Sequence, residues 1–412
     1  MPRLLRRALA ALVLAAAPAA AQRAAPSDST ADSTADSARA PARGAWHERV
    51  TLRGYAQARY NRLFETNPRL VCSQCDRSLV RNGGIFLRRA RVSIVAQPND
   101  RVTLVFQPDF TAEASETNGG IAQVRDAYVE VGFGANHGTR LRLGQTNVPH
   151  GFENLLSSAK RLPFDRVDAL NSAAPTERDL GIYLFWSPRM ARARYLALAE
   201  GAGKGTGDFG VVSVAAYNGQ TANRPEQNNN LHTALRLAYP FAVGAGQLVE
   251  AGVQGYVGRF VVTASQRTPN SGGTAEFADQ RAAAFVVLHA NPVGVQAEWT
   301  MGTGPEADPA SRTIRERRLQ GGYVQASVRT HVGGQAVTPY ARAQRYDGGK
   351  KFELDARRYR VRELEAGAEW AASPDVELTA AFQLAERETA DLADPDNRQT
   401  GHRMRLQAQF SF

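Results

Sequence analysis

The chain has 412 residues, with 50 Lys+Arg against 40 Asp+Glu, a hydrophobic content of 43% and two cysteines. This length fits two or three ordinary domains or one large all-β barrel. A helical membrane protein needs several runs of about 20 apolar residues, and the only long apolar run here lies at the N-terminus, so that class is excluded. Two cysteines are too few for a disulfide-rich secreted scaffold. The formal net charge of +10 leaves nucleic acids, acidic surfaces and anionic solutes open as partners. Arginine supplies nearly all of the positive charge, which we attribute mainly to the codons of a GC-rich genome. The four lysines are Lys160, Lys204, Lys350 and Lys351.

The first 45 residues predict a targeting segment followed by a linker. Residues 1–21 combine a basic start, an apolar stretch at Ala8–Ala17 and a small-residue end, which is typical of a secretory signal peptide cleaved near Ala21. A buried N-terminal helix is the alternative interpretation. Residues 22–45 are rich in Ser, Ala and Asp and contain almost no large apolar side chain, so they predict a flexible linker. The folded domain is therefore expected at residues 46–412.

From Val50 to the C-terminus, apolar and polar residues alternate with a period of two, which indicates β-strands. The last ten residues show the pattern most clearly, with Phe410 and Phe412 on one face and Arg405 on the other. We count sixteen such strands. They are expected at 50–61, 85–97, 101–110, 121–131, 139–146, 179–186, 209–217, 231–239, 247–257, 281–290, 293–301, 318–329, 336–346, 360–370, 376–387 and 403–412.

The lengths and connections of these strands favour a transmembrane antiparallel barrel over a soluble sandwich. A barrel strand of about 9–11 residues spans a bilayer with one face toward lipid and the other toward a polar lumen. Tight turns alternate with long polar connections, as expected for short periplasmic turns and long external loops. A β-solenoid would need a fixed repeat, which this sequence lacks. The tight turns are 98–100, 291–292 and 372–374, and the long connections are 62–84, 111–120, 147–178, 218–230, 259–280, 302–317, 347–359 and 388–402.

One connection does not follow this alternation. Ser187–Asp208 should be a short turn, yet it is long and holds the basic stretch Arg192–Tyr195. Either the turn is enlarged or the seventh strand starts earlier, and the sequence leaves both interpretations open.

Six segments carry motifs that occur together in one family. The most specific is 143–153, Leu-Gly-Gln-Thr-Asn-Val-Pro-His-Gly-Phe-Glu, which leads into the longest connection of the predicted barrel. In their order along the chain the segments resemble the phosphate-selective porin O and P family of outer-membrane channels, over nearly all of residues 50–412. The segments are 52–55, 86–91, 125–130, 143–153, 176–181 and 217–219.

The resemblance implies a barrel of about 16 strands in the cell outer membrane, in contact with outer-membrane lipid and often a homotrimer. Its third loop would fold inward and narrow the pore, and members include channels that prefer phosphate or polyphosphate. The terminal Phe412, with Phe410 two residues before it, resembles the signal by which the barrel-assembly machinery handles such proteins. The family also has a lysine cluster, which four lysines cannot rebuild here.

The parity of the alternation assigns charged residues to the lumen, because an arginine facing the bilayer midplane costs roughly 2–4 kcal/mol. The early strands supply mainly Arg and the later strands much of the Glu, which predicts a basic wall facing a more acidic one. Fixed positive charge in a narrow passage lowers the cost of anion entry. The alternative is that these arginines only solvate the wall, paired with glutamates. The predicted anion-attracting residues are Arg53, Arg59, Arg89, Arg91, Arg140 and Arg142, and the acidic wall comprises Glu250, Glu298, Glu363, Glu365 and Glu369.

The third-loop segment 147–178 is the expected constriction, since a connection this long inside a compact fold is usually functional or disordered. Lys160, Arg161 and Arg166 are its expected pore-facing charges, and Leu155–Arg161 could form a short helix within it.

The remaining chemistry-bearing residues do not indicate an enzyme. Cys72 and Cys75 form a CxxC without a thioredoxin-like setting or neighbouring histidines, so a local disulfide is expected, with free thiols as the alternative. The seven histidines are scattered without metal-binding spacing, and the sequence shows no nucleophile elbow or phosphate-cradling loop. We therefore expect no catalytic residue, no metal and no cofactor.

The sequence as a whole predicts an exported outer-membrane porin, a passive channel for small hydrophilic solutes with a tilt toward anions such as phosphate. A non-conducting structural or adhesive barrel, closed by its loops, is the alternative. Because the alternation places much of the positive charge inside a barrel, no nucleic-acid partner is expected.

Overall fold

The computed structural model describes residues 46–63, 84–115, 118–174, 176, 178–201, 203–244, 246–268, 275–390, 395 and 397–412. The signal peptide predicted at 1–21, the linker predicted at 22–45 and the cysteine pair Cys72 and Cys75 lie outside these residues.

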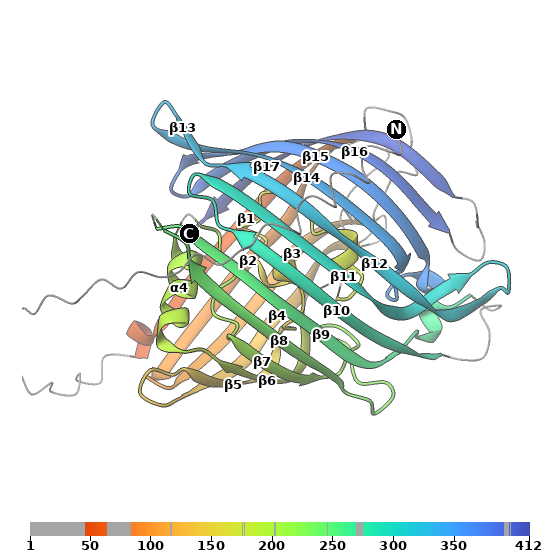
Figure 1. Cartoon of the computed structure of the whole chain (residues 1–412), viewed down its shortest axis with the longest axis horizontal. Coiled ribbons are helices and arrows are strands. Elements are labelled where there is room, and N and C mark those ends of the chain that lie inside the picture. Colours follow the sequence, from red (N-terminus) through yellow and green to blue (C-terminus); the bar gives the residue numbers. More distant parts are fainter. Residues whose placement is uncertain are drawn as a thin grey trace, which may run out of the picture. The chain divides into compact units, whose positions relative to one another are not determined.

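Within the described residues, a single antiparallel sheet closes on itself as a barrel, because β1 pairs with both β2 and β17 (Figure 1). Seventeen strands are distinguished, but β13 is a three-residue piece that pairs with β14 directly after β12 does, so the wall has the sixteen strands predicted. The strands are β1 (Val50–Leu63), β2 (Gly84–Asn99), β3 (Val102–Ser115), β4 (Asn118–Phe133), β5 (Thr139–Asn147), β6 (Arg178–Trp186), β7 (Val212–Tyr217), β8 (His232–Ala242), β9 (Leu248–Val261), β10 (Glu276–Leu288), β11 (Val293–Asp308), β12 (Thr313–Val328), β13 (Thr330–Val332), β14 (Gln335–Gly349), β15 (Arg358–Ser373), β16 (Val376–Ala390) and β17 (Arg398–Ser411).

Helices are few and short in the described chain, and none of them is long and apolar enough to cross a membrane. They are η1 (Trp46–Arg49), α2 (Phe152–Leu155), α3 (Asp168–Asn171), α4 (Arg189–Glu200), η2 (Ala264–Gln266) and η3 (Leu354–Ala356).

The strands have polar side chains inside the barrel and apolar side chains outside. On β8, Arg236 is fully buried, whereas its neighbours Leu235 and Leu237 are 49% and 43% exposed. A soluble sandwich would bury the leucines and expose the arginine. This inverted arrangement is stable where the outer face meets lipid and the inner face meets water and other polar groups.

Two segments predicted as long loops are largely strand. Residues 111–115 belong to β3 and residues 118–120 to β4. The β11–β12 ladder continues to the pair Asp308 and Thr313, which leaves only 309–312 between the two strands. In the sequence, the outward apolar residues end before these strands do, and the predicted strands are too short for that reason. The backbone ladder extends beyond that point, because a hairpin outside the apolar band needs no apolar face.

The connection between β6 and β7 is an enlarged turn, and it contains α4. This decides between the two interpretations of Ser187–Asp208, since β7 starts at Val212, later than the predicted Phe209. In Figure 1, α4 lies at the end of the barrel where the C-terminus lies. Tyr195 on α4 is buried, and its hydroxyl donates to the Ala238 carbonyl of β8. Segment 187–211, here called the helical turn, is therefore packed against the barrel wall.

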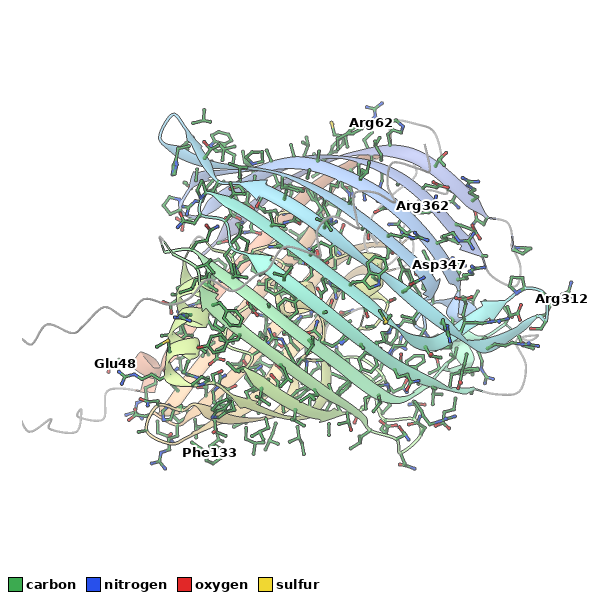
Figure 2. The ribbon with its side chains drawn as sticks, viewed as in Figure 1. Glu48, Arg62, Phe133, Arg312, Asp347 and Arg362 are labelled. Atoms are coloured by element: carbon green, nitrogen blue, oxygen red, sulfur yellow. The ribbon has the colours of Figure 1, made fainter. Side chains whose placement is uncertain are left out.

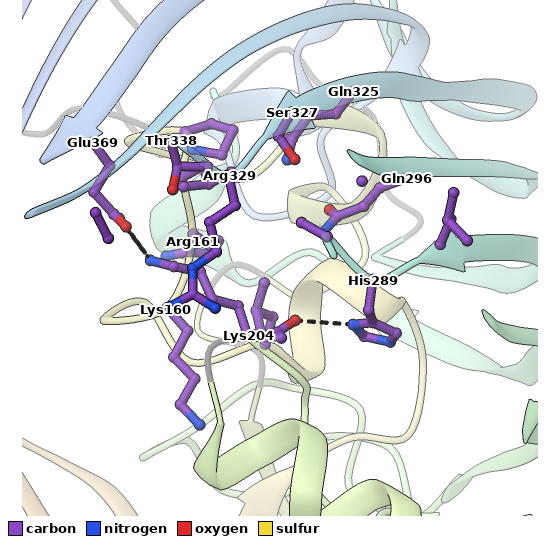
Figure 3. A pocket seen from close by; sticks show the side chains of 18 of the residues that line it. Lys160, Arg161, Lys204, His289, Gln296, Gln325, Ser327, Arg329, Thr338 and Glu369 are labelled. Carbon is purple, nitrogen blue, oxygen red and sulfur yellow. Dashed lines mark hydrogen bonds and ion pairs between the residues drawn. The ribbon is translucent and has the colours of Figure 1, made fainter. Parts of the chain in front are cut away.

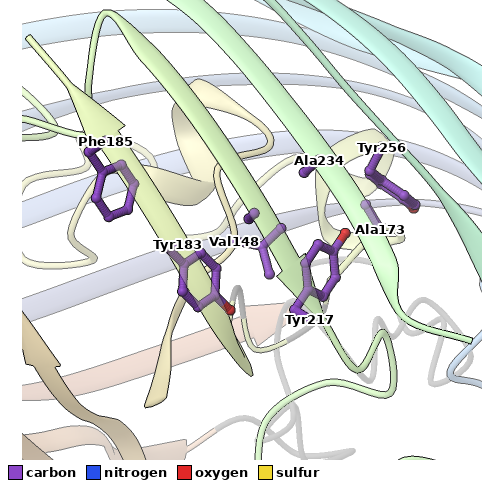
Figure 4. Close-up of a cluster of buried hydrophobic side chains, with 8 residues drawn as sticks. Val148, Ala173, Tyr183, Phe185, Tyr217, Ala234 and Tyr256 are labelled. Atoms are coloured by element: carbon purple, nitrogen blue, oxygen red, sulfur yellow. The ribbon is translucent and has the colours of Figure 1, made fainter. Parts of the chain in front are cut away.

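The third loop, residues 148–177 between β5 and β6, folds into the barrel as predicted. Its two ends are held by an aromatic cluster on the inner wall, in which Val148 and Ala173 pack with Tyr183, Tyr217 and Tyr256 (Figure 4). The middle of the loop reaches the opposite wall: Val167, Ala169 and Leu170 of the α3 region pack against the inner residues Leu319, Tyr323, Tyr346, Tyr359 and Val361 of β12, β14 and β15.

The helix expected at Leu155–Arg161 forms instead at Phe152–Leu155, with a second helical turn at α3. Pro163 disfavours helical geometry at the residue before it, and the chain has already left the helix at Leu156. The loop is therefore mostly irregular, and its position depends on side-chain contacts with the barrel.

Candidate pore constriction

The basic residues predicted on the early strands lie on the inner face, and most have acidic partners. Arg91 contacts Asp109 at 2.6 Å, and Arg142 contacts Glu130 at 2.7 Å. Arg89 donates to the side-chain carbonyl of Gln57 at 2.9 Å. The charges of Arg91 and Arg142 are therefore largely offset close to the wall, whereas the partner of Arg89 is a neutral amide.

Two more of the predicted basic residues lie elsewhere on the same face. Arg140 contacts Asp208 at the end of the helical turn, at 2.8 Å. Arg53 is exposed near the start of β1, on the face that carries Tyr55 and Gln57. Of the early-strand set, Arg53 is thus the residue whose charge is most accessible to solvent.

The third loop brings carboxylates to the basic wall. Asp165 lies 3.2 Å from Arg59 of β1, 2.9 Å from Arg405 of β17 and 3.6 Å from Arg88 of β2. Burial alone would raise the pKa of Asp165, but the charges of Arg59, Arg405 and Arg88 together hold that pKa well below its ordinary value. Asp165 therefore stays ionised and fastens the loop to the seam where β1 meets β17.

A second loop carboxylate, Asp168, is fixed to the opposite side. It lies 3.0 Å from Arg387 of β16 and contacts Lys350 of the β14–β15 connection. Burial again acts to raise the pKa of Asp168, and the charges of Arg387 and Lys350 overcome this and lower it. Arg387 in turn contacts Glu363 at 2.5 Å, and Arg403 contacts the same carboxylate at 3.2 Å.

The other predicted acidic residues also have defined partners. Glu298 accepts from the backbone N–H of Phe152 at 2.9 Å. The remaining contacts are Glu250 with Arg236 at 2.7 Å, Glu365 with the Tyr340 hydroxyl at 2.8 Å, and Glu369 with Lys204 at 2.5 Å. The loop residue Glu153, which was not among them, contacts Arg342 at 2.9 Å.

The helical turn enters the same space from the other end, which sequence reasoning did not predict. After α4, its chain lies so that Lys204 reaches Glu369 of β15 at 2.5 Å, with Glu377 of β16 at 3.9 Å. The Gly203 carbonyl contacts the Nδ1 atom of His289 at 2.9 Å. The excess length of Ser187–Asp208 was the available signal. The direction in which the segment folds depends on these long-range pairs, which no local pattern encodes.

Lys160 joins the third loop to the helical turn, since its ammonium group donates to the carbonyl of Ala199. Burial lowers the pKa of Lys160, and the nearby charge of Lys204 lowers it further. The two elements thus meet inside the barrel, each approaching from a different end.

A cavity of about 140 Å³ lies between the third loop, the helical turn and the inner faces of β11, β12, β14 and β15 (Figure 3). Its cationic lining residues are Lys160, Arg161, Lys204 and Arg329, and its acidic lining residues are Glu153, Glu369 and Glu377. Arg329, at the break between β12 and β13, was not predicted from the sequence. Arg166 does not line this cavity, because it donates within the loop to Asn154 at 2.9 Å and to the Ala174 carbonyl at 3.2 Å.

The space also has uncharged hydrogen-bonding groups. Gln325 is 3% exposed, and its side-chain oxygen has no hydrogen-bond partner within the described residues. Ser327 and Gln296 line the same cavity. The unpaired Gln325 oxygen is an acceptor, so it can bind water or a donor group of a solute but not an anion directly. The described residues contain no cluster of three or more His, Cys, Asp or Glu suited to a metal ion.

Comparisons with known proteins agree with this architecture. The family described as phosphate-selective porin O and P matches residues 72–412. Among solved structures, the outer membrane channel DcaP of Acinetobacter baumannii is similar with a TM-score of 0.54 at 14% identity, over 88% of this chain and 97% of that one. Salmonella typhi OmpF in complex with daunomycin gives 0.53 at 13% identity, over 88% and 97%. The anion-selective porin from Comamonas acidovorans gives 0.50 at 10% identity, over 88% and 99%. A search of the curated proteins finds no match.

Proposed function

Since the chain belongs to the phosphate-selective porin O and P family of outer-membrane channels, we propose that it is a passive diffusion channel for small hydrophilic solutes, with a preference for anions such as phosphate. The solutes would pass between the third loop and the helical turn. Homotrimeric assembly, insertion by the barrel-assembly machinery and export by the N-terminal signal peptide are parts of the same proposal.

The observation that carries the anion preference is the cationic lining of the cavity between the two inserted segments. Most arginines of the early strands are offset by carboxylates, so the net field along the passage depends on the charges that line the cavity, where four cations face Glu153, Glu369 and Glu377. Lys160, Arg161 and Arg329 face the cavity, and Arg53 lies at the start of β1. An anion that enters a narrow, partly desolvated passage gains more from such charges than it would in bulk water.

Removing two of these charges is expected to weaken the anion preference. In Lys160→Gln/Arg161→Gln, the anion-to-cation permeability ratio should fall by about two- to fivefold, because fixed charge at the narrow part of a pore dominates its selectivity. The reversal potential across a KCl gradient in planar bilayers measures this ratio. Arg315→Gln/Arg317→Gln is the matched control, since it removes the same charge from half-exposed side chains of the β11–β12 hairpin.

Two results would contradict the anion proposal. One is a cation preference in the unmodified channel, which would leave the porin fold intact but remove the anion assignment. The other is an equal change in the permeability ratio for the control and the double variant, which would mean that surface charge sets the selectivity.

The helical turn favours one alternative function, a non-conducting structural or adhesive barrel. Two inserted segments meet in the lumen through Lys160, and Lys204 is paired across it with Glu369. Well-folded protein that shows heat-modifiable gel mobility and no single-channel current would support this alternative.

A further inference from the structure

The outer face of β12, β14, β15 and β16 changes from apolar to charged between two neighbouring rows of outward-facing side chains. One row of directly paired, outward-facing residues is Val324, Ala343, Leu364 and Leu384. Two residues farther toward the long connections, roughly 7 Å along the strands, the corresponding row contains Arg345, Arg362 and Glu386. In a transmembrane barrel, such a boundary marks the level where hydrocarbon gives way to lipid headgroups.

Arg345 and Arg362 are direct cross-strand partners, and both side chains are exposed. Among the described residues, neither has an ion pair or a side-chain hydrogen bond. The next arginine on β15, Arg360, lies two residues farther from the apolar band and does form ion pairs. It contacts Glu388 at 2.9 Å and Asp347 at 3.5 Å. Glu386 lies directly opposite Arg362 on β16, but its carboxylate contacts Arg398 at 2.5 Å. The two arginines next to the apolar band therefore form no ion pair within the described part of the chain, although a carboxylate lies on the neighbouring strand.

Like charges placed directly opposite each other on adjacent strands destabilise a sheet. An anion between Arg345 and Arg362 would relieve this repulsion, and two guanidinium groups can hold the oxygens of one phosphate in paired hydrogen bonds. At the edge of the apolar band, the cost of exposing arginine to lipid falls to about 0–1 kcal/mol. The position thus suits an arginine that reaches a headgroup phosphate.

We propose that Arg345 and Arg362 form a binding site on the outside of the barrel for the phosphate of a phosphorylated lipid headgroup in the outer leaflet. In Figure 2, Arg362 and Asp347 lie toward the end of the barrel that carries Arg312 on the β11–β12 hairpin, and so on the side of the long connections. The site is separate from the lumen and does not depend on conduction.

A groove beside the pair offers room for the rest of such a headgroup. Its volume is about 1030 Å³, and its lining includes Arg318, Gln320, Asp347 and Arg358. The groove also contains acidic residues, of which Glu306 contacts Arg358 at 3.6 Å. Hydrogen-bonding groups of both kinds suit the hydroxyls of sugar rings that carry phosphates.

The test is binding of bisphosphorylated lipid A to the full-length purified protein, followed by native mass spectrometry in detergent. In Arg345→Gln/Arg362→Gln, the affinity for the lipid should fall by about tenfold or more, because hydrogen bonds between charged groups are lost. Arg345→Lys/Arg362→Lys should keep part of the affinity, since lysine retains the charge without the planar fork. Arg101→Gln/Arg189→Gln is the matched control, with the same charge removed from exposed residues at the other end of the barrel.

Heat-modifiable gel mobility should be the same for all variants, because the arginines are exposed. The proposal is overturned if the Arg345/Arg362 double variant binds lipid A as the unmodified protein does. It is also overturned if lipid A without its phosphates binds equally well, or if inorganic phosphate at equal concentration displaces the lipid. A change of oligomeric state in the double variant would assign the pair to a contact between protomers and would likewise overturn it.

Discussion

Replacing Arg189–Gly207 by two glycines is expected to raise the single-channel conductance by about two- to fivefold, since conduction depends on the width of the narrowest passage. The helical turn lies at one side of the cavity between itself and the third loop. Removing the segment takes away Lys204 and the carbonyl of Ala199, which contact Glu369 and Lys160. The passage should then be limited by the third loop alone.

The barrel should tolerate this deletion because the strand ends on either side of the turn are held independently. The Ser187 hydroxyl donates to Asp208 at 2.7 Å, and the Val211 N–H donates to the Trp186 carbonyl at 2.7 Å. Asp208 also keeps its contact with Arg140. Heat-modifiable gel mobility would verify that the shortened protein folds.

A point variant separates the effect of the length of the helical turn from the effect of its ion pair with Glu369. In Lys204→Gln the turn keeps its length but loses the ion pair with Glu369, so we expect a mean conductance near that of the unmodified channel with more frequent current fluctuations. Equal conductance in the deletion variant and the unmodified protein would show that the turn does not limit the passage. No current in either would favour the non-conducting barrel.

The fold could be predicted from the sequence because its signal is local and repeated. Each strand places apolar residues toward lipid and polar residues inward. A few consecutive positions therefore show which residues face outward, such as Leu235, and which face inward, such as Arg236. The strand ends were less predictable, as at Met301, where the outward apolar residues end but β11 continues to Asp308. There the backbone ladder extends the strand without any change in side-chain period.

The constriction was predictable in its location but not in its electrostatics. The length and motif of the third loop predict an inserted segment, and its lysine and arginines are predicted to face the pore. Which charges remain accessible depends on pairs far apart in the chain, such as Asp165 with Arg405 or Lys204 with Glu369. Opposite charges on separate strands have no sequence signature, so the parity that places Arg59 inside cannot show that Asp165 offsets it.

Asp168→Asn is expected to release the third loop from the far wall. Asp168 is fully buried between Arg387 and Lys350, and an amide cannot offset either charge. Removing one member of a buried ion pair costs about 3–5 kcal/mol, because the remaining charges stay desolvated without a partner. The loop, which is held there mainly by this cluster and the apolar contacts of α3, should then detach from the inner wall and become mobile.

Limited trypsin digestion measures this release, since the loop contains Lys160, Arg161 and Arg166. We expect cleavage at these positions in Asp168→Asn under conditions where the unmodified protein stays intact. Asp168→Asn/Lys350→Gln should regain part of the protection, because it removes one of the unpartnered cations. Glu316→Gln, an exposed carboxylate on β12, is the control for the loss of one negative charge. Full protection of Asp168→Asn would show that the ion pairs do not hold the loop.

The carboxylate of Asp168 also determines how the docking of the third loop on the inner wall should depend on pH. The pKa of Asp168 is lower in the folded protein than in the unfolded chain, so its stabilising contribution is complete above the unfolded value of about 3.9. That contribution is lost only as the pH falls through the lower, folded-state pKa. Trypsin sites in the loop of the unmodified protein should therefore stay protected at neutral pH, and acid-stable pepsin should begin to cut the loop only well below pH of about 4. Loop cleavage that begins near pH 6 would mean that a group other than Asp168 controls the docking of the loop.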